Sequence, residues 1–215
     1  MKRGGVLFCL VGPAGSGKNT IEAELLRQRQ GTITRSISVT SRQPRTGEVD
    51  GQDYFFVSVD EFNERVARGD FFEWEEVHGN YYGTLNDTLR QAVENGRDLL
   101  LVIEIRGALN VKKHFPSDTF ITFLAPPSFD VLRSRMQARG GLNERQIAVR
   151  LDTARSEYRK MCEVVLQPGV AAVDYLVVND DLKEACAAVA KILDVERSRI
   201  SRFDRADLQA FCHVD

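Results

Sequence analysis

The sequence predicts an α/β fold built on a five-stranded parallel sheet with helices on both faces. Short apolar runs alternate along the chain with helical stretches, which is the order of elements in strand–helix–strand units. A glycine-rich turn that contains a lysine follows the first apolar run, at the carboxyl end of a strand, where sheets of this kind bind ligands. The expected strands are 6–11, 33–39, 99–105, 120–124 and 175–178, and the expected helices are 21–30, 107–114, 129–139, 145–162 and 182–195.

Composition limits the kinds of protein that this chain can be. Its 215 residues are 43% hydrophobic, which is enough for one sizeable core with appendages, and a net charge of −2 argues against a general nucleic-acid binder or membrane-surface protein. The apolar run 6–11 is too short for a signal peptide or a membrane span. The cysteines lack the spacing of a zinc site: they are Cys9, Cys162, Cys186 and Cys212. We therefore expect a cytoplasmic protein that binds neither nucleic acid nor membrane, and its oligomeric state stays open.

The first expected strand leads into a candidate phosphate-binding loop. Gly15 and Gly17 let backbone N–H groups converge on an anion, the start of the next helix adds partial positive charge, and Lys18 adds a full charge. An ordinary glycine turn is the alternative, but a lysine directly after Gly17 disfavours it. Asn19 stands where Ser or Thr usually offers a hydroxyl to magnesium, so it is a weak candidate for a metal contact through water. The loop residues are Gly12, Pro13, Ala14, Gly15, Ser16, Gly17, Lys18, Asn19 and Thr20.

The segment from Thr40 to Gly96 differs in texture from the rest of the chain. Aromatic-rich stretches at 54–57 and 71–77 flank a short helix expected at 60–68. Their alternating pattern predicts a small mixed or antiparallel sheet inserted into the parallel scaffold.

Two arginines lie three residues apart in a loop that Pro44 stiffens. Arg42 and Arg45 have no carboxylate between them, so we expect their guanidinium groups to repel each other unless an anion binds there. A phosphate group matches their planar donors, and a solvated basic loop is the alternative. A second arginine-rich region extends from 127 to 158.

Several motifs in a fixed order resemble the guanylate kinase family. Besides the glycine-rich loop, they are Thr-Ser-Arg-Gln-Pro-Arg-Thr-Gly-Glu at 40–48, Phe-Phe-Glu-Trp at 71–74, Gly-Asn-Tyr-Tyr-Gly-Thr at 79–84, Ala-Pro-Pro-Ser at 125–128, Arg-Gly at 139–140 and Val-Asn-Asp-Asp at 178–181. The resemblance covers nearly the whole chain apart from the tail.

This resemblance implies a fold, a domain division and a reaction. The fold is that of the P-loop nucleoside monophosphate kinases, and the reaction is phosphoryl transfer from ATP, used with Mg²⁺, to GMP, giving ADP and GDP. The implied domains are a core in 1–39, 86–126 and 159–195, a GMP-binding domain in 40–85, a helical lid in 127–158 and a C-terminal tail in 196–215.

The resemblance also assigns residues to GMP. A carboxylate at Glu73 would accept hydrogen bonds from N1–H and the exocyclic amine of guanine, whereas adenine offers neither group there. Hydroxyls at Ser38 and Thr84 would donate to guanine O6, and dGMP is expected to bind as well. The full implied GMP set is Ser38, Arg42, Arg45, Tyr54, Glu73, Tyr82, Thr84 and Glu104, in which the two arginines and the two tyrosines hold the phosphate.

On the ATP side, the resemblance places Asn179 near the adenine and three lid arginines near the phosphates, where they would neutralise charge on the transferring group. Two structural alternatives stay open. Lid arginines can instead pair with Glu144, Glu157 or Glu163, and a helix N-cap at Asp180 or Asp181 can lie beside Asn179. The implied catalytic residues are Lys18, Arg42, Arg135, Arg139 and Arg150.

One strand end departs from the family pattern, in which an Asp–hydrophobic–Asp pair is followed by Gln-Gly. Here Val102 replaces one carboxylate, Glu104 lengthens the other, and Arg106 replaces the amide. Together with Asn19, these changes predict weaker protein contacts to magnesium and a higher magnesium requirement. They also keep two other functions open: a non-catalytic guanylate-kinase-like interaction module, and a related kinase with a different acceptor such as a phosphorylated sugar.

Overall fold

A five-stranded parallel sheet forms the centre of the molecule. The computed structural model describes residues 3–77, 79–138, 140–141, 143–165 and 173–212. The sheet has the order β2-β7-β1-β8-β9, and every neighbouring pair is parallel. The predicted parallel sheet is therefore confirmed. Its strands are β1 (Leu7–Val11), β2 (Ile33–Arg35), β7 (Asp98–Val102), β8 (Thr119–Ala125) and β9 (Tyr175–Val178).

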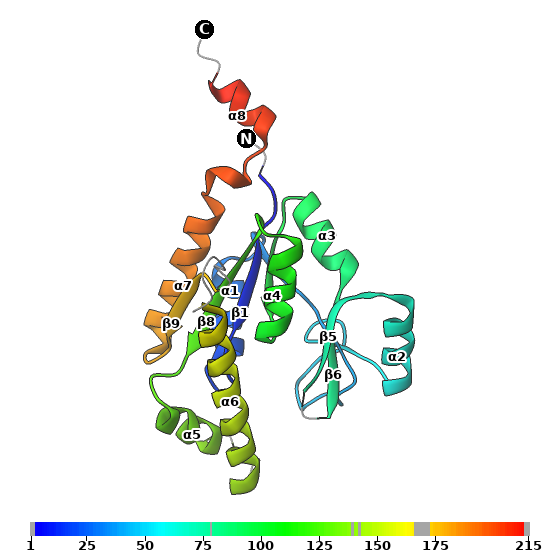
Figure 1. The fold of residues 1–215 in the computed structure, drawn as a ribbon, viewed down its shortest axis with the longest axis vertical. Coiled ribbons are helices and arrows are strands. Elements are labelled where there is room, and N and C mark those ends of the chain that lie inside the picture. The colour runs from blue at the N-terminus through cyan, green and yellow to red at the C-terminus, as the bar shows by residue number, and fades with distance from the viewer. Residues whose placement is uncertain (1–2, 78, 139, 142, 166–172, 213–215) are drawn as a thin grey trace.

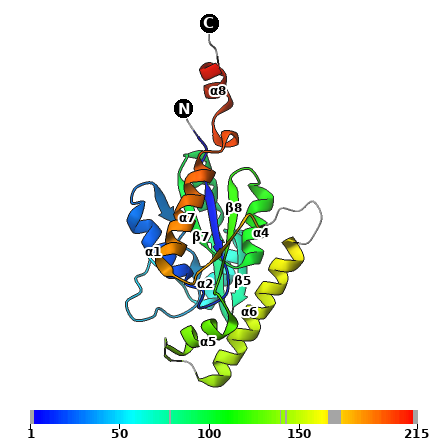
Figure 2. The same cartoon turned by 90° about the vertical axis from the view of Figure 1, so that its left-hand side faces the viewer.

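Helices cover both faces of this sheet, which explains why β1 is apolar at every position. Phe8 and Leu10 face a core cluster with α1 (Lys18–Gln28) and α7 (Leu182–Arg197). The intervening residue Cys9 faces a second cluster on the other side. That second cluster is completed by α3 (Asn86–Glu94), α4 (Ile105–His114) and α6 (Glu144–Val165). Figure 2 shows α1 and α7 on one side of the sheet and α4 and α6 on the other.

A second sheet lies beside the first, together with α2 (Val59–Arg68) (Figure 1). Its order is β4-β3-β6-β5, with β3 and β4 parallel and the other pairs antiparallel, so the predicted mixed insert is confirmed. Phe62 of α2 is fully buried against Phe71. The strands are β3 (Val39–Thr40), β4 (Phe55–Phe56), β5 (Phe71–Val77) and β6 (Asn80–Leu85).

Two helices at one end of the molecule form a small layer of their own (Figure 1). α5 (Phe129–Ala138) and α6 bury Leu132, Met136 and Ile147 between them in a separate apolar cluster. This pair contains the arginine-rich region that the sequence singled out.

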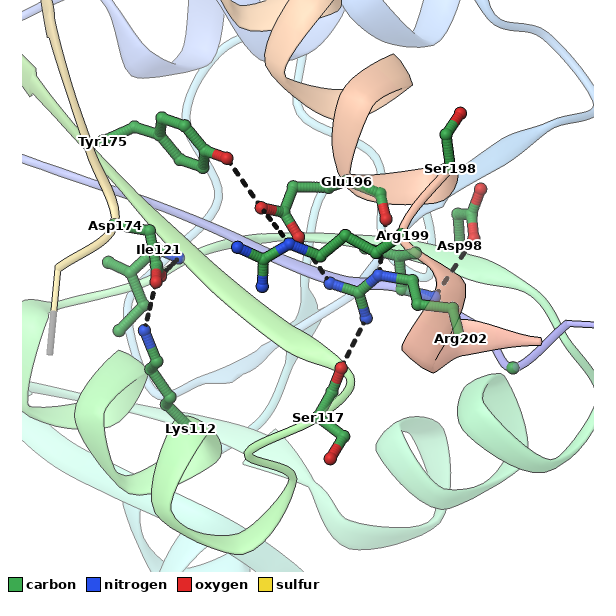
Figure 3. Close-up of polar contacts among 12 residues, drawn as sticks. Asp98, Lys112, Ser117, Ile121, Asp174, Tyr175, Glu196, Ser198, Arg199 and Arg202 are labelled. Atoms are coloured by element: carbon green, nitrogen blue, oxygen red, sulfur yellow. Dashed lines mark hydrogen bonds and ion pairs between the residues drawn. The ribbon is translucent and has the colours of Figure 1, made fainter. Parts of the chain in front are cut away.

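Residues 200–203 lie near the beginning of the chain, at the opposite end of the molecule from α5 (Figure 1). Arg202, in the short helix η1 (Ile200–Arg202), is buried and donates to Glu196 and to the carbonyl of Ser117, as Figure 3 shows. Gly4 N–H donates to Arg202 O at 2.8 Å. α8 (Arg205–Cys212) then projects beyond the body of the molecule (Figures 1 and 2).

Two of the expected strands were wrong in extent. The run 33–39 divides between the sheets: β2 ends at Arg35 and β3 begins at Val39. The run 99–105 also ends early, because β7 stops at Val102 and Ile105 already begins α4. In both places a strand-like pattern continues after the chain has left the sheet, so the pattern alone does not show where the strand ends.

The helices differ less from expectation. α3 was not expected, although the chain carries its apolar face at Leu89 and Ala92. The predicted end of the helix 129–139 falls on Arg139, which lies outside the described residues. Among the described residues, no helix is both long and apolar enough to cross a membrane.

Candidate active site

A cavity of about 510 Å³ lies at the carboxyl ends of β1 and β7. Its walls come from four parts of the chain: the phosphate-binding loop (12–20), the second sheet, the segment after β7 and the inner face of α6. The position agrees with the rule that parallel α/β sheets bind ligands beyond the carboxyl ends of their strands.

The loop's glycines adopt backbone conformations that other residues rarely adopt. Gly12, Gly15 and Gly17 have φ angles of 138°, 90° and 102°. A Cβ atom at Gly12 would lie 2.2 Å from the carbonyl oxygen of Leu124, so the loop also passes close to β8. α1 begins at Lys18 without a side-chain cap, and helix starts of this kind offer N–H groups to an anion.

Lys18 lies folded over the loop. Its Nζ donates to the carbonyl oxygens of Gly12 and Pro13, the latter at 3.2 Å. Because both carbonyls belong to the loop, the ammonium group stays close to the N–H groups that would surround a phosphate.

Asn179 supports the phosphate-binding loop through a side-chain hydrogen bond. It is buried, and its Nδ2 donates to Ser16 O at 2.7 Å. Arg135 of α5 donates to Asn179 O at 2.9 Å, so one residue links the loop to the α5–α6 layer. The N-cap alternative is confirmed next to it, because Asp181 caps α7 by accepting from Glu184 N–H.

Glu73 and Thr84 form a polar pair in the wall made by the second sheet. They are opposite one another in the β5–β6 register, and Thr84 Oγ1 donates to Glu73 Oε1 at 2.6 Å. Burial raises the pKa of Glu73, the hydrogen bond from Thr84 opposes this, and the nearby charges of Glu75 and Glu104 add to the rise. Gly107 leaves room for the carboxylate, since a Cβ there would lie 2.7 Å from Glu73 Oε2.

Arg42 and Arg45 line the same cavity with two tyrosines, Tyr54 and Tyr82. The tyrosine rings meet edge-on with centroids 6.0 Å apart. No carboxylate lies between the two arginines in the sequence, but Glu48 is paired with Arg42 at 2.9 Å. The loop folds back on itself, so a residue six positions along the chain supplies the anion.

Sequence reasoning missed Glu157 as a cavity residue and considered it only as an ion-pair partner. Glu157 is 7% exposed and lines the cavity from α6. Burial raises its pKa to about 7, the charge of Glu104 adds to the rise, and Lys18 opposes it. Helical spacing was the available signal, because Arg150, Thr153 and Glu157 lie on one face of α6 and all reach the cavity.

Comparison with known proteins agrees with this geometry. The sequence profile of the family described as guanylate kinase matches residues 5–196. A guanylate kinase of Thermotoga maritima is 41% identical over 92% of this chain and 90% of its own length, and one of Bacillus subtilis is 41% identical over 94% of each. The chain belongs to the guanylate kinase family. A crystal structure of guanylate kinase from Anaplasma phagocytophilum, at 33% identity, superposes with a TM-score of 0.75 over 94% of this chain and 90% of that one.

Most residues that the guanylate kinase resemblance singled out meet at the cavity. Those that line it are Ala14, Gly15, Gly17, Lys18, Asn19, Ser38, Arg42, Arg45, Tyr54, Glu73, Tyr82, Glu104 and Arg150. Gly12, Pro13, Ser16 and Thr20 complete the loop behind these residues, where Thr20 N–H and Ile21 N–H donate to Gly17 O.

The arginines that were expected in a lid of this guanylate kinase family member have different surroundings. Arg135 donates to the carbonyls of Asn179 and Asp180, and Glu144 is paired instead with Arg133 at 2.7 Å. Arg139, the third of the expected lid arginines, lies outside the described residues. The three residues that depart from the expected family pattern have different positions: Val102 and Glu104 line the cavity, whereas the side chain of Arg106 is 69% exposed.

Proposed function

We propose that this chain transfers the γ-phosphoryl group of ATP to GMP, giving ADP and GDP. The observation that carries the proposal is that one cavity joins a phosphate-binding loop to the half-buried carboxylate of Glu73 and to two arginines. The first element suits a nucleoside triphosphate, and the second suits the base and phosphate of a nucleoside monophosphate. Membership of the guanylate kinase family supports the same reaction.

The GMP half of the proposed site recognises both ends of the substrate. Glu73 accepts from N1–H and the exocyclic amine of guanine, while Ser38 donates to O6. Thr84 holds Glu73 through its hydroxyl, so in this arrangement it orients the carboxylate rather than donating to the base. Arg42, Arg45, Tyr54 and Tyr82 hold the phosphate, Glu104 lies on the same side, and dGMP is expected to be accepted with GMP.

The ATP half consists of the loop, the residues that support it and the lid. Lys18 and the loop N–H groups bind the phosphates, and Asn179 supports the loop on the side where the adenine is expected. Arg135, Arg139 and Arg150 approach when the lid closes. The segment 127–158 acts as this lid over a core of 1–39, 86–126 and 159–195, while 40–85 carries GMP and 196–215 forms the tail.

These residues supply the rate by positioning and by charge. No covalent intermediate is needed, because in-line alignment of two phosphates, neutralisation of the transferring oxygens and exclusion of water account for catalysis in this reaction class. Lys18, Arg42 and Arg150 line the cavity where that charge develops, and Arg135 and Arg139 join them through the lid.

Magnesium fits this site as an ion held mainly by ATP. Among the described residues no cluster of three or more His, Cys, Asp or Glu side chains could hold a metal alone. Asn19 lines the cavity, and its amide oxygen suits a magnesium ion directly or through a water molecule. When bound with ATP, the ion neutralises phosphate charge.

We expect Asn19→Ser to lower the magnesium concentration needed for the half-maximal rate. Equal concentrations for the variant and the wild type in a magnesium titration would exclude a role of Asn19 in the magnesium requirement.

A coupled assay that measures ADP release tests the proposed function. GMP and dGMP should be phosphorylated, and AMP and ribose 5-phosphate should not. Lys18→Ala should abolish turnover with little loss of GMP binding. No turnover with any acceptor would favour the interaction module, and turnover with the sugar phosphate alone would favour a different kinase.

A further inference from the structure

Arg42 is held on several sides by its own chain. Its Nη2 donates to Glu48 Oε1 at 2.9 Å, and its Nη1 donates to Gln43 O at 2.7 Å. Its guanidinium carbon also lies 5.4 Å from the ring centroid of Tyr54 and 5.7 Å from that of Phe56, within the range of cation–π attraction. The arginine side chain is only 12% exposed, so its direction is fixed although it belongs to a loop.

The same carboxylate also fixes the second arginine's backbone. Glu48 Oε2 accepts from Arg45 N–H at 2.7 Å, and Glu48 N–H donates to Arg45 O at 3.0 Å. Between them Gly47 has a φ angle of 89°, which closes the turn. One side chain therefore sets the guanidinium of Arg42 and the chain direction at Arg45 together.

The charge balance favours this arrangement. Partial burial of Glu48 works against its charged form, but hydrogen bonds from Arg42 and from the Arg45 N–H outweigh burial and hold the pKa of the carboxyl below its ordinary value. Glu48 is thus ionised at neutral pH. It relieves part of the repulsion between the arginines and leaves a net positive pair for an anion.

The position of Glu48 bears on whether this carboxylate orders Arg42 or competes with a bound ligand for it. Arg42, Arg45, Tyr54 and Tyr82 all line the cavity, whereas Glu48 does not. The carboxylate therefore lies behind Arg42, and it does not stand where a ligand would enter. A guanidinium has five N–H donors, so the bonds to Glu48 and Gln43 leave others for a phosphate.

We propose that Glu48 is a positioning residue that preorganises Arg42 and Arg45 for the phosphate of the nucleoside monophosphate. The inference rests on the proposed function and adds a residue to it. Binding to a clamp that is already ordered avoids the entropic cost of fixing two long side chains on a loop. The alternative is that Glu48 competes with the substrate phosphate for Arg42. The two roles predict opposite changes in GMP affinity when Glu48 is replaced.

The test is a kinetic comparison of the wild-type chain with Glu48→Gln. Glutamine keeps the size of the side chain but has one acceptor oxygen in place of two, so it cannot satisfy both Arg42 and Arg45 N–H. Because charged hydrogen bonds contribute about 1.5–3 kcal/mol each, we expect the KM for GMP to rise about tenfold or more. The KM for ATP should stay within about twofold, and Glu48→Asp should restore part of the GMP affinity.

Glu61→Gln is the matched control. Glu61 pairs with Arg65 at 2.7 Å on α2 in the same part of the molecule, and it does not line the cavity. Its KM for GMP should equal that of the wild type. An unchanged or lower KM for GMP in Glu48→Gln would overturn the inference, as would an equal rise in both KM values. A wild-type chain that fails to phosphorylate GMP would instead overturn the proposed function.

Discussion

Gly17 shows at the scale of one residue how little space the phosphate-binding loop leaves. Its φ angle of 102° is strained for other residues, and a Cβ there would lie 2.3 Å from Asn179 Nδ2. That nitrogen is the donor that holds Ser16 O. A side chain at 17 would therefore disturb both the backbone and the brace of the loop.

We expect Gly17→Ala to raise the KM for ATP about tenfold or more and to lower the free energy of unfolding by about 1–3 kcal/mol, because backbone strain and a displaced buried amide add together. ATP titrations and urea denaturation measure the two effects. Gly31→Ala is the control, since Gly31 has a φ angle of 79° but nothing within 4 Å of its missing Cβ. If both variants change the KM for ATP equally, the collision with Asn179 has no role.

Helix α6 contributes charged residues to the cavity wall and carries an electrostatic cost. It presents Arg150 and Glu157 to the cavity along one face, and its apolar face packs on α5 through Ile147 and Leu151. The carboxyl of Glu157 is buried, and its pKa is raised from 4.5 to about 7. The folded protein therefore holds a proton there that the unfolded chain releases at a lower pH.

The sign of the resulting pH dependence follows from this rise. Between the two pKa values, raising the pH ionises Glu157 in the unfolded chain first, so its contribution to stability falls as the pH rises towards about 7. Glu157→Gln should thus have a higher Tm than the wild type at about pH 8, and the difference should be several times smaller at about pH 5. Thermal melts at the two pH values measure it. Glu163→Gln, an exposed change on the same helix, should show no such difference; a Glu157→Gln difference that is equal at both pH values would contradict the argument.

In the molecule as a whole, buried ion pairs join segments near the two ends of the chain at the side of the parallel sheet where its strands begin. Asp98 at the start of β7 pairs with Arg3 at 2.6 Å and with Arg197 at 2.8 Å. Glu196 is fully buried and pairs with Arg202, as Figure 3 shows. The phosphate-binding loop lies at the carboxyl ends of the strands. We therefore expect this network of ion pairs to affect the stability of the protein and not its cavity.

We expect Arg202→Leu to lower the free energy of unfolding by about 3 kcal/mol or more, because it leaves the buried charge of Glu196 without its main partner. The kcat and both KM values of the folded variant should not change. Arg199→Leu is the control: Arg199 also pairs with Glu196, at 3.3 Å, but its side chain is 56% exposed, so the loss should be about 1 kcal/mol or less. Equal losses in urea denaturation would show that burial does not decide the value of these pairs.

Comparison of the expected and observed elements shows where sequence patterns lose information. The phosphate-binding loop was predicted because glycines and a lysine at a strand–helix junction leave few alternatives. The run 33–39 was assigned to one strand because its residues suit a strand throughout, and only the pairing partners show that β2 and β3 belong to different sheets. Glu48 was overlooked because its bond to Arg42 depends on a turn that sequence separation does not reveal.

The alternation of strands and helices, the loop that suits a phosphate and the family of the chain could all be inferred from the amino-acid sequence. These follow from local chemistry: apolar periodicity, glycine conformation and motif order. Which charges share a cavity became visible only in the folded molecule. The fold brings Glu157 of α6 within electrostatic range of Glu104 and Lys18. It also pairs Glu48 with Arg42, and Glu196 with Arg202 at the side of the sheet where its strands begin. The reason is physical, because burial and electrostatic coupling depend on distance in space, and a linear sequence does not specify that distance.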